Sequence, residues 1–100
     1  MTTSPLIALL TDFGASGYYV AAVKGVLLSL APSAVLVDIT HEVPPQDVPQ
    51  GAFLLGQAYR FFPQGTLFLA VVDPGVGTER RGLLLLTPQG RFIGPDKGRL

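Results

Sequence analysis

Apolar residues along this chain fall alternately into short runs and into longer stretches with helical spacing. Mostly apolar runs at 6–10, 34–39 and 66–72 have the length and composition of buried strands. Between them lie 18–30, where apolar residues recur at i, i+4, i+7, i+8 and i+11, and a segment from 47 to 62 with similar spacing. Strands that alternate with helices predict a parallel sheet with right-handed crossovers.

The last third of the chain has a different pattern. Strand-like segments at 82–87 and 91–93 flank the turn sequence Pro88-Gln-Gly90 and predict a β-hairpin. Another turn sequence occupies 94–98, and the chain stops at Leu100 on the way into a further strand. We therefore predict an α/β fold with a mostly parallel sheet and flanking helices, in the order βαβαβ and then a β-hairpin, as part of an incomplete domain.

Composition narrows the class of protein. Of 100 residues, 48% are hydrophobic and 14% are charged, so disorder is excluded and further protein is expected to cover some of the apolar surface. Seven basic and seven acidic residues balance without a basic run, which argues against a nucleic-acid partner. The apolar run before Asp12 lacks a cationic start and is too short to span a membrane, so we expect a cytoplasmic protein without a membrane partner.

Two carboxylates follow strands that should end at the same edge of the sheet. Asp12 follows the first predicted strand and Asp73 the third, and each is followed by glycine within two residues. An ionised carboxylate accepts several hydrogen bonds and can hold both hydroxyls of a vicinal diol such as a ribose. Alternatively, each aspartate caps its own loop through local backbone hydrogen bonds. The pattern indicates a shared crevice outside the carboxyl ends of the strands.

The loop from Asp73 to Arg80 is rich in glycine and can fold back on itself. An ion pair between these two residues would hold Asp73 ionised and lower its pKa. A surface salt bridge of little energetic weight is the alternative. Arg81 competes for the same role, because spacing alone does not separate it from Arg80.

Other possible sites have weaker support. Asp12-Phe-Gly14 matches the kinase magnesium triplet, but the other kinase motifs are missing. His41-Glu42 begins like a zinc-protease motif without a second histidine, and the chain has no cysteine, so we expect no metal site and a structural role for His41. The aromatic residues are expected in the core rather than in a stacking platform: Tyr18, Tyr19, Tyr59, Phe61, Phe62 and Phe68.

Six motifs occur in a specific order and span nearly all of the chain. They are Thr11-Asp-Phe-Gly14, Lys24-Gly25, Asp38-Ile-Thr-His-Glu-Val-Pro-Pro45, Phe62-Pro-Gln-Gly-Thr66, Val72-Asp-Pro-Gly-Val-Gly-Thr78 with Arg80, and Gly94-Pro-Asp96 with Gly98. Together they resemble the S-adenosylmethionine hydroxide adenosyltransferases. Those enzymes are related to fluorinating and chlorinating enzymes that act on the same substrate.

The resemblance implies a reaction and assigns roles. Water attacks the ribose 5′-carbon of S-adenosylmethionine, which is the substrate, and adenosine and methionine form without a cofactor. Asp73 and Arg80 correspond to catalytic residues, Asp12 and Asp73 to substrate-binding residues. Gln46 is likewise assigned to substrate binding, since it stands where the fluorinating relatives place an aromatic residue against the substrate. The halide-using relatives carry tyrosine at position 73, so Asp73 favours water over halide.

The resemblance also implies parts that this chain lacks. Family members have a catalytic histidine further along, a β-rich C-terminal domain that supplies most adenine contacts, and a homotrimer with sites between subunits. Residues 1–100 would then be a partial N-terminal α/β domain, inactive or impaired alone. Lys97 and Arg99 differ from the residues that the family usually has at these positions. A non-catalytic nucleoside-binding or assembly module and a halide-using halogenase remain alternative functions.

Overall fold

The computed structural model describes residues 4–72, 82–86 and 92–93. Its elements in chain order are β1 (Leu6–Thr11), α1 (Tyr19–Leu30), β2 (Val35–Thr40), α2 (Val48–Ala58), the short 3₁₀ helix η1 (Tyr59–Phe61), β3 (Leu67–Val72), β4 (Gly82–Leu86) and β5 (Phe92–Ile93). The predicted order of strands and helices is confirmed. The second predicted helix ends earlier than expected, since its last turn tightens into η1.

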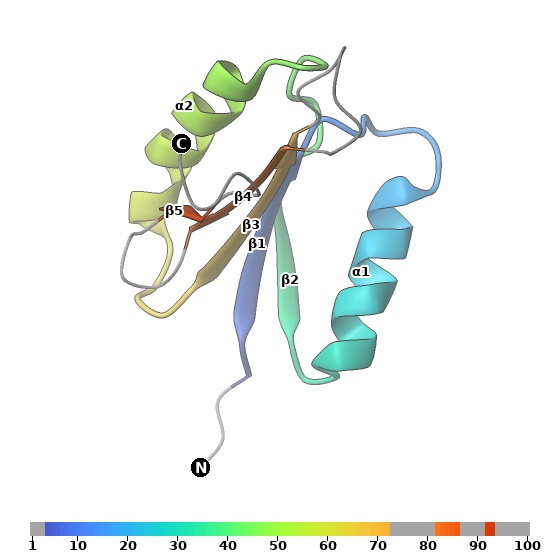
Figure 1. Ribbon diagram of the computed structural model, residues 1–100. Helices are drawn as coiled ribbons and strands as arrows, with labels where there is room; N and C mark the ends of the chain where they lie inside the picture. Colours follow the sequence, from blue (N-terminus) through green and yellow to red (C-terminus); the bar gives the residue numbers. More distant parts are fainter. Residues whose placement is uncertain (1–3, 73–81, 87–91, 94–100) are drawn as a thin grey trace.

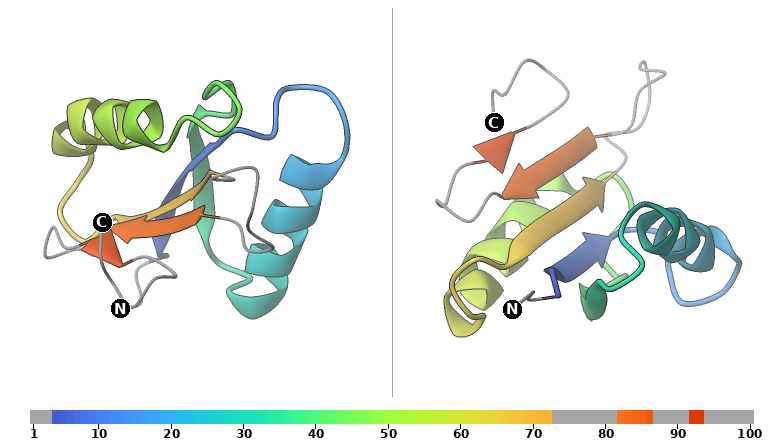
Figure 2. Two further views of the ribbon diagram at one scale, coloured as in Figure 1. Left: turned by 45° about the horizontal axis from the view of Figure 1, so that its top comes forward. Right: turned by 90° about the horizontal axis from the view of Figure 1, so that it is seen from below.

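The five strands form one sheet in the order β2-β1-β3-β4-β5. β1 pairs in parallel with both β2 and β3, whereas β4 and β5 are antiparallel to their neighbours, so the α/β class with a mostly parallel first part is confirmed. Figures 1 and 2 show α1 and α2 on opposite sides of this sheet. The chain runs outward from β1 to β2 and then returns across β1 to β3, so the direction of winding reverses between β1 and β3.

A closed core lies between the sheet and α2. Alternate residues of β1 and β3 point to this side, because successive strand side chains face opposite ways. Together with Val43 and Leu55 they form the buried cluster Ala8, Leu10, Val43, Leu55, Phe68, Ala70 and Val72. Phe62 packs edge-on against Phe68, with ring centroids 5.3 Å apart. Asp47 begins α2 as predicted, since its side chain accepts the Gln50 N–H at 3.0 Å.

α2 approaches the sheet closely at Gly51, a buried helical glycine. A Cβ atom there would lie 3.1 Å from Cγ2 of Val72, whereas one at Gly56 on the same helix meets nothing within 4 Å among the described residues. Gly51→Leu is expected to destabilise the protein by about 1–3 kcal/mol through overpacking. Gly56→Leu is the matched control and should stabilise it by about 0.5–1 kcal/mol through helix propensity. Denaturant unfolding measures both, and equal effects at the two positions would contradict the close approach.

The side of the sheet that carries α1 is more open. No residue of α1 is buried in the described structure, and Val26 and Leu30 of the predicted apolar face are 59% and 78% exposed. The expectation that the aromatic residues lie in the core is correct for Phe68 and wrong for four others, because Tyr18, Tyr19, Tyr59 and Phe61 are exposed. Within the described ranges, no helix has the length and apolar content needed to cross a bilayer.

Candidate functional site at the carboxyl end of β1

Asp12 is the first residue after β1 and lies where the winding of the sheet reverses. Its backbone N–H donates to the Val71 carbonyl of β3 at 3.3 Å, which ties the start of the loop to the neighbouring strand. In doubly wound sheets, ligands bind outside the carboxyl ends of the strands at this kind of switch point. Asp12, whose carboxylate is predicted to bind ribose, is half-buried. It lies at the position where an α/β sheet binds a ligand.

The structure brings two of the predicted substrate-binding residues together. The backbone N–H of Gln46, from the connection between β2 and α2, donates to Asp12 Oδ2 across a long distance of 3.4 Å. Gln46 has a φ of +69°, the only positive value among the described residues other than glycine. A non-glycine residue in this region carries a local conformational cost, and such residues concentrate at functional sites. Asp73, Arg80 and Arg81 lie outside the described residues.

The loop that carries Asp12 is held by the segment that follows β2. The Gly14 N–H donates to the His41 carbonyl at 2.7 Å, and the Val43 N–H donates to the Thr11 carbonyl at 3.3 Å. Gly14 has a φ of +83°, a conformation that suits glycine because it lacks a Cβ atom. Residues 11–14 and 41–46 therefore form two adjoining loops that are hydrogen-bonded to each other.

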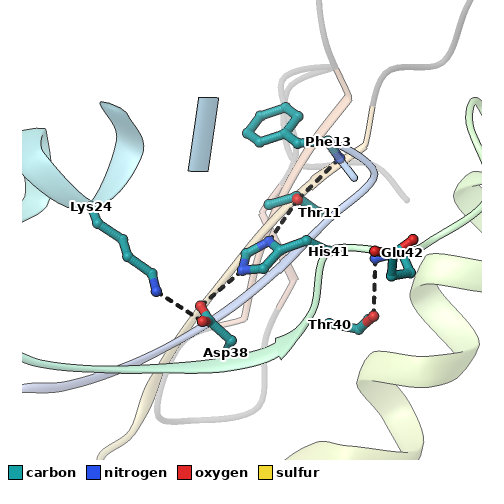
Figure 3. A network of polar contacts seen from close by, with 7 residues as sticks. All are labelled: Thr11, Phe13, Lys24, Asp38, Thr40, His41 and Glu42. Carbon is teal, nitrogen blue, oxygen red and sulfur yellow. Dashed lines mark hydrogen bonds and ion pairs between the residues drawn. The ribbon is translucent and has the colours of Figure 1, made fainter. Parts of the chain in front are cut away.

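Four side chains from β1, α1 and the end of β2 form a hydrogen-bonded chain, called here the strand-end network (Thr11, His41, Asp38 and Lys24; Figure 3). Thr11 Oγ1 and His41 Nδ1 are 2.8 Å apart, and His41 Nε2 is 2.8 Å from Asp38 Oδ1. Lys24 Nζ donates to the other oxygen, Asp38 Oδ2, at 2.8 Å. Thr11 Oγ1 also accepts the Phe13 N–H at 3.2 Å. The network therefore links α1 and two strands to the loop that carries Asp12, through Thr11 and Phe13.

Charge fixes the direction of this network. Partial burial raises the pKa of Asp38, but the hydrogen bonds and charges of Lys24 and His41 outweigh that effect and hold the pKa below its ordinary value of 3.8. An ionised carboxylate only accepts hydrogen bonds, so His41 Nε2–H is the donor to Asp38. In the neutral ring Nδ1 is then the acceptor, and the Thr11 hydroxyl donates to it while accepting the Phe13 N–H.

The lowered pKa of Asp38 predicts a dependence of stability on pH. A carboxyl group with a depressed folded-state pKa contributes stability above its ordinary value of 3.8, and this contribution disappears as pH falls through the folded-state value. The destabilisation caused by Asp38→Asn should therefore be largest at neutral pH and shrink in acid. The effect is expected to be small, because the Asp38 side chain is 40% exposed. Denaturant unfolding of both proteins across this pH range measures it, and a difference independent of pH would contradict it.

Sequence reasoning expected a structural role for His41, and its two ring contacts fit that role, but the strand-end network was not foreseen. Thr11 and His41 are 30 positions apart, and Lys24 and Asp38 are 14 apart, so only the folded chain brings them together. Lys24 gave one available signal, since it is the only charged residue in an apolar helix. Asp38 gave another, because it stands three residues before the only histidine.

Comparison with known proteins identifies relatives of this chain. Residues 7–100 match the family described as SAM hydroxide adenosyltransferase N-terminal domain. The (R)-S-adenosyl-L-methionine hydrolase of Salinispora arenicola is 47% identical over 100 residues, which cover the whole of this chain and 38% of that protein. A fluorinase from an Actinoplanes species is 38% identical over 86 residues, covering 86% of this chain and 29% of that enzyme.

A solved structure gives the same result for the fold. An uncharacterized conserved protein from Thermotoga maritima is 41% identical, with a TM-score of 0.72, and the match covers 88% of this chain and 34% of that protein. This chain therefore spans about a third of the length of these relatives. The ordered motifs, the α/β fold and the match over residues 7–100 agree, and the chain belongs to the SAM hydroxide adenosyltransferase family.

Proposed function

We propose that the protein to which this chain belongs hydrolyses S-adenosyl-L-methionine to adenosine and L-methionine. The observation that carries the proposal is the place of Asp12 at the β1/β3 switch point, beside the strand that leads into Asp73. The choice of reaction is supported by the 47% identity with a protein named as a hydrolase of this substrate. The function is that of the full-length protein, meaning this chain with any residues that its gene encodes on either side.

The proposed reaction is a displacement at the ribose 5′-carbon. A lone pair of water forms the new C5′–O bond while the C5′–S bond breaks, and sulfur takes the bonding pair to become the neutral thioether of methionine. Water loses one proton, so the products are adenosine, methionine and H⁺. Because water has a pKa near 15.7 and is a weak nucleophile, in-line placement and removal of its proton both lower the barrier.

Each predicted residue has a distinct role in this proposal. The Asp12 carboxylate accepts hydrogen bonds from the ribose hydroxyls, which fixes the sugar at the edge of the sheet. Asp73 orients the attacking water and accepts its proton, and Arg80 keeps Asp73 ionised. Gln46 shapes the pocket beside Asp12, to which its backbone N–H is already joined. Support for the Asp73 role is the parallel register of β1 and β3, which ends both strands at one edge.

The source of the incoming oxygen tests the proposal. The full-length protein is incubated with S-adenosylmethionine in water enriched in ¹⁸O, and the products are separated by chromatography and weighed by mass spectrometry. Adenosine should carry one ¹⁸O atom and methionine none, since the C5′–S bond is the one that breaks. Unlabelled adenosine, or no adenosine at all, would contradict hydrolysis at this carbon.

Two alternatives have distinct outcomes in the same assay. A halide-using enzyme would release a 5′-halogenated nucleoside when chloride or fluoride is added. The 38% identity with a fluorinase is the reason to test this alternative. A non-catalytic nucleoside-binding module would bind adenosine without consuming S-adenosylmethionine. We further propose a cytoplasmic homotrimer, to be checked by light scattering and cell fractionation of the full-length protein.

A further inference from the structure

We propose that His41 and Thr11 are positioning residues for Asp12: the strand-end network holds the loop of residues 11–14 in the shape that presents the Asp12 carboxylate to a sugar. This inference rests on the proposed function, because it takes a ribose diol as the group that Asp12 binds. The network contains no reacting group. It acts through the backbone on either side of Asp12.

The contacts bracket Asp12 from both directions. His41 reaches the residue before Asp12 through its ring, at 2.8 Å from Thr11 Oγ1, and reaches Gly14 through its carbonyl oxygen at 2.7 Å. Thr11 Oγ1 also accepts the Phe13 N–H, so one hydroxyl links the histidine ring to the residue that follows Asp12. The ring and the carbonyl of His41 therefore contact the segment that carries the carboxylate on both sides of Asp12.

Burial makes the Thr11 hydroxyl sensitive to its partner. Thr11 is 1% exposed, so water cannot replace His41 as the acceptor of its proton. A buried polar group that loses its hydrogen bond carries its full desolvation cost. The ring itself is held from the far side by Asp38, and Asp38 by Lys24. A continuous chain of hydrogen bonds therefore runs from Lys24 of α1 to Thr11 and Phe13 (Figure 3).

The connection between β2 and α2 also contacts the Asp12 side chain itself. The Gln46 N–H donates to Asp12 Oδ2, and Gln46 lies only five residues after His41 in the same connection. The connection therefore reaches the Asp12 loop at its backbone, through Gly14, and at its carboxylate, through Gln46. Preorganisation of this kind increases affinity, because the loop does not have to be ordered when the ligand binds.

The test measures adenosine binding to the full-length protein by calorimetry. Thr11→Val keeps the size and β-branching of the side chain but removes the hydroxyl, and it is expected to weaken adenosine binding roughly tenfold. Thr11→Ser restores the hydroxyl and should return affinity to within about threefold of the original. Ser29→Ala, which removes an exposed hydroxyl bonded within α1, is the matched control and should change nothing.

A second ligand separates positioning from general damage to the fold. 2′,3′-Dideoxyadenosine lacks the 2′- and 3′-hydroxyls that form the diol, so the loss caused by Thr11→Val should vanish for this nucleoside. Equal losses for the two nucleosides, or no loss for adenosine, would overturn the inference. If Thr11→Val does not fold, Asp38→Asn at the exposed end of the network replaces it, with an expected loss of about threefold and the same dependence on the hydroxyls.

The proposed function fails separately. If adenosine does not bind, or if Asp12→Ala leaves its affinity unchanged, the sugar site itself is wrong and the positioning role falls with it. If Asp12→Ala abolishes binding while Thr11→Val binds normally, the sugar site stands and only the positioning role is overturned. The ring tautomer gives an independent check, since ¹⁵N chemical shifts should show a protonated Nε2 and an unprotonated Nδ1 in neutral His41 and the reverse in Asp38→Asn.

Discussion

Replacing Asp73 by asparagine is expected to lower kcat for adenosine formation roughly 10²- to 10⁴-fold, the range for loss of a positioned proton acceptor. The amide has nearly the same size as the carboxylate. It has no negative charge to attract the proton that water loses, and it cannot accept that proton. The asparagine side chain can still accept a hydrogen bond from the substrate, so the loss should appear in kcat rather than in KM. Steady-state assays of adenosine by chromatography measure both constants in the full-length protein.

Asp47→Asn makes the same chemical change at a carboxylate that caps α2. Asparagine and aspartate are similar helix caps, so this control should retain both folding and turnover. A kcat for Asp73→Asn within threefold of the original would contradict the catalytic assignment. If Asp12 still governs adenosine affinity, that outcome would mean that residues 1–100 bind the nucleoside and that the residues of the reaction lie elsewhere in the full-length protein.

The second large effect is expected at Asp12, where Asp12→Ala should weaken adenosine binding roughly 100-fold or more. Two hydroxyl hydrogen bonds to an ionised acceptor are lost, each about 1.5–3 kcal/mol, and a factor of ten corresponds to about 1.4 kcal/mol. The backbone N–H of Gln46 also loses its carboxylate partner. Calorimetry with adenosine measures the change directly.

Matched nucleosides show whether the loss concerns the sugar. The affinity of 2′,3′-dideoxyadenosine should be nearly the same for the original protein and for Asp12→Ala, because neither complex contains the hydroxyl contacts. A comparable loss for both nucleosides would mean that Asp12 supports the loop rather than the ligand. Thermal unfolding of Asp12→Ala monitored by circular dichroism separates that case from misfolding.

Hydrophobic patterning was enough to predict the elements, because each one is encoded locally. The strand patterns of β1 and β3 and the cap at Asp47 all depend on residues within a few positions of one another. The order of the elements also predicted the edge of the sheet at which Asp12 lies, because parallel strands on either side of a switch point end at the same edge. These features were therefore predictable from the sequence.

The strand-end network needed coordinates. Whether Asp38 faces Lys24 or solvent depends on how far β2 slides along β1, and the pairing contains an irregularity between Leu9 and Leu10. A slip of one residue reverses the face of every side chain, so local patterns do not determine such contacts. The apolar spacing of α1 likewise predicts which side chains share a face, but not how much of that face the described part of the chain covers.

The backbone angle at Gln46 limits which residues can replace the one that contacts Asp12. At a φ of +69°, β-branched residues clash with their own main chain and proline is excluded by its ring, whereas glycine and asparagine fit readily. A saturation library at this position should therefore lose valine, isoleucine, threonine and proline for reasons unrelated to the ligand. Variation in substrate preference at position 46 must come from unbranched, aromatic or very small residues, because the backbone angle of the turn admits few other types.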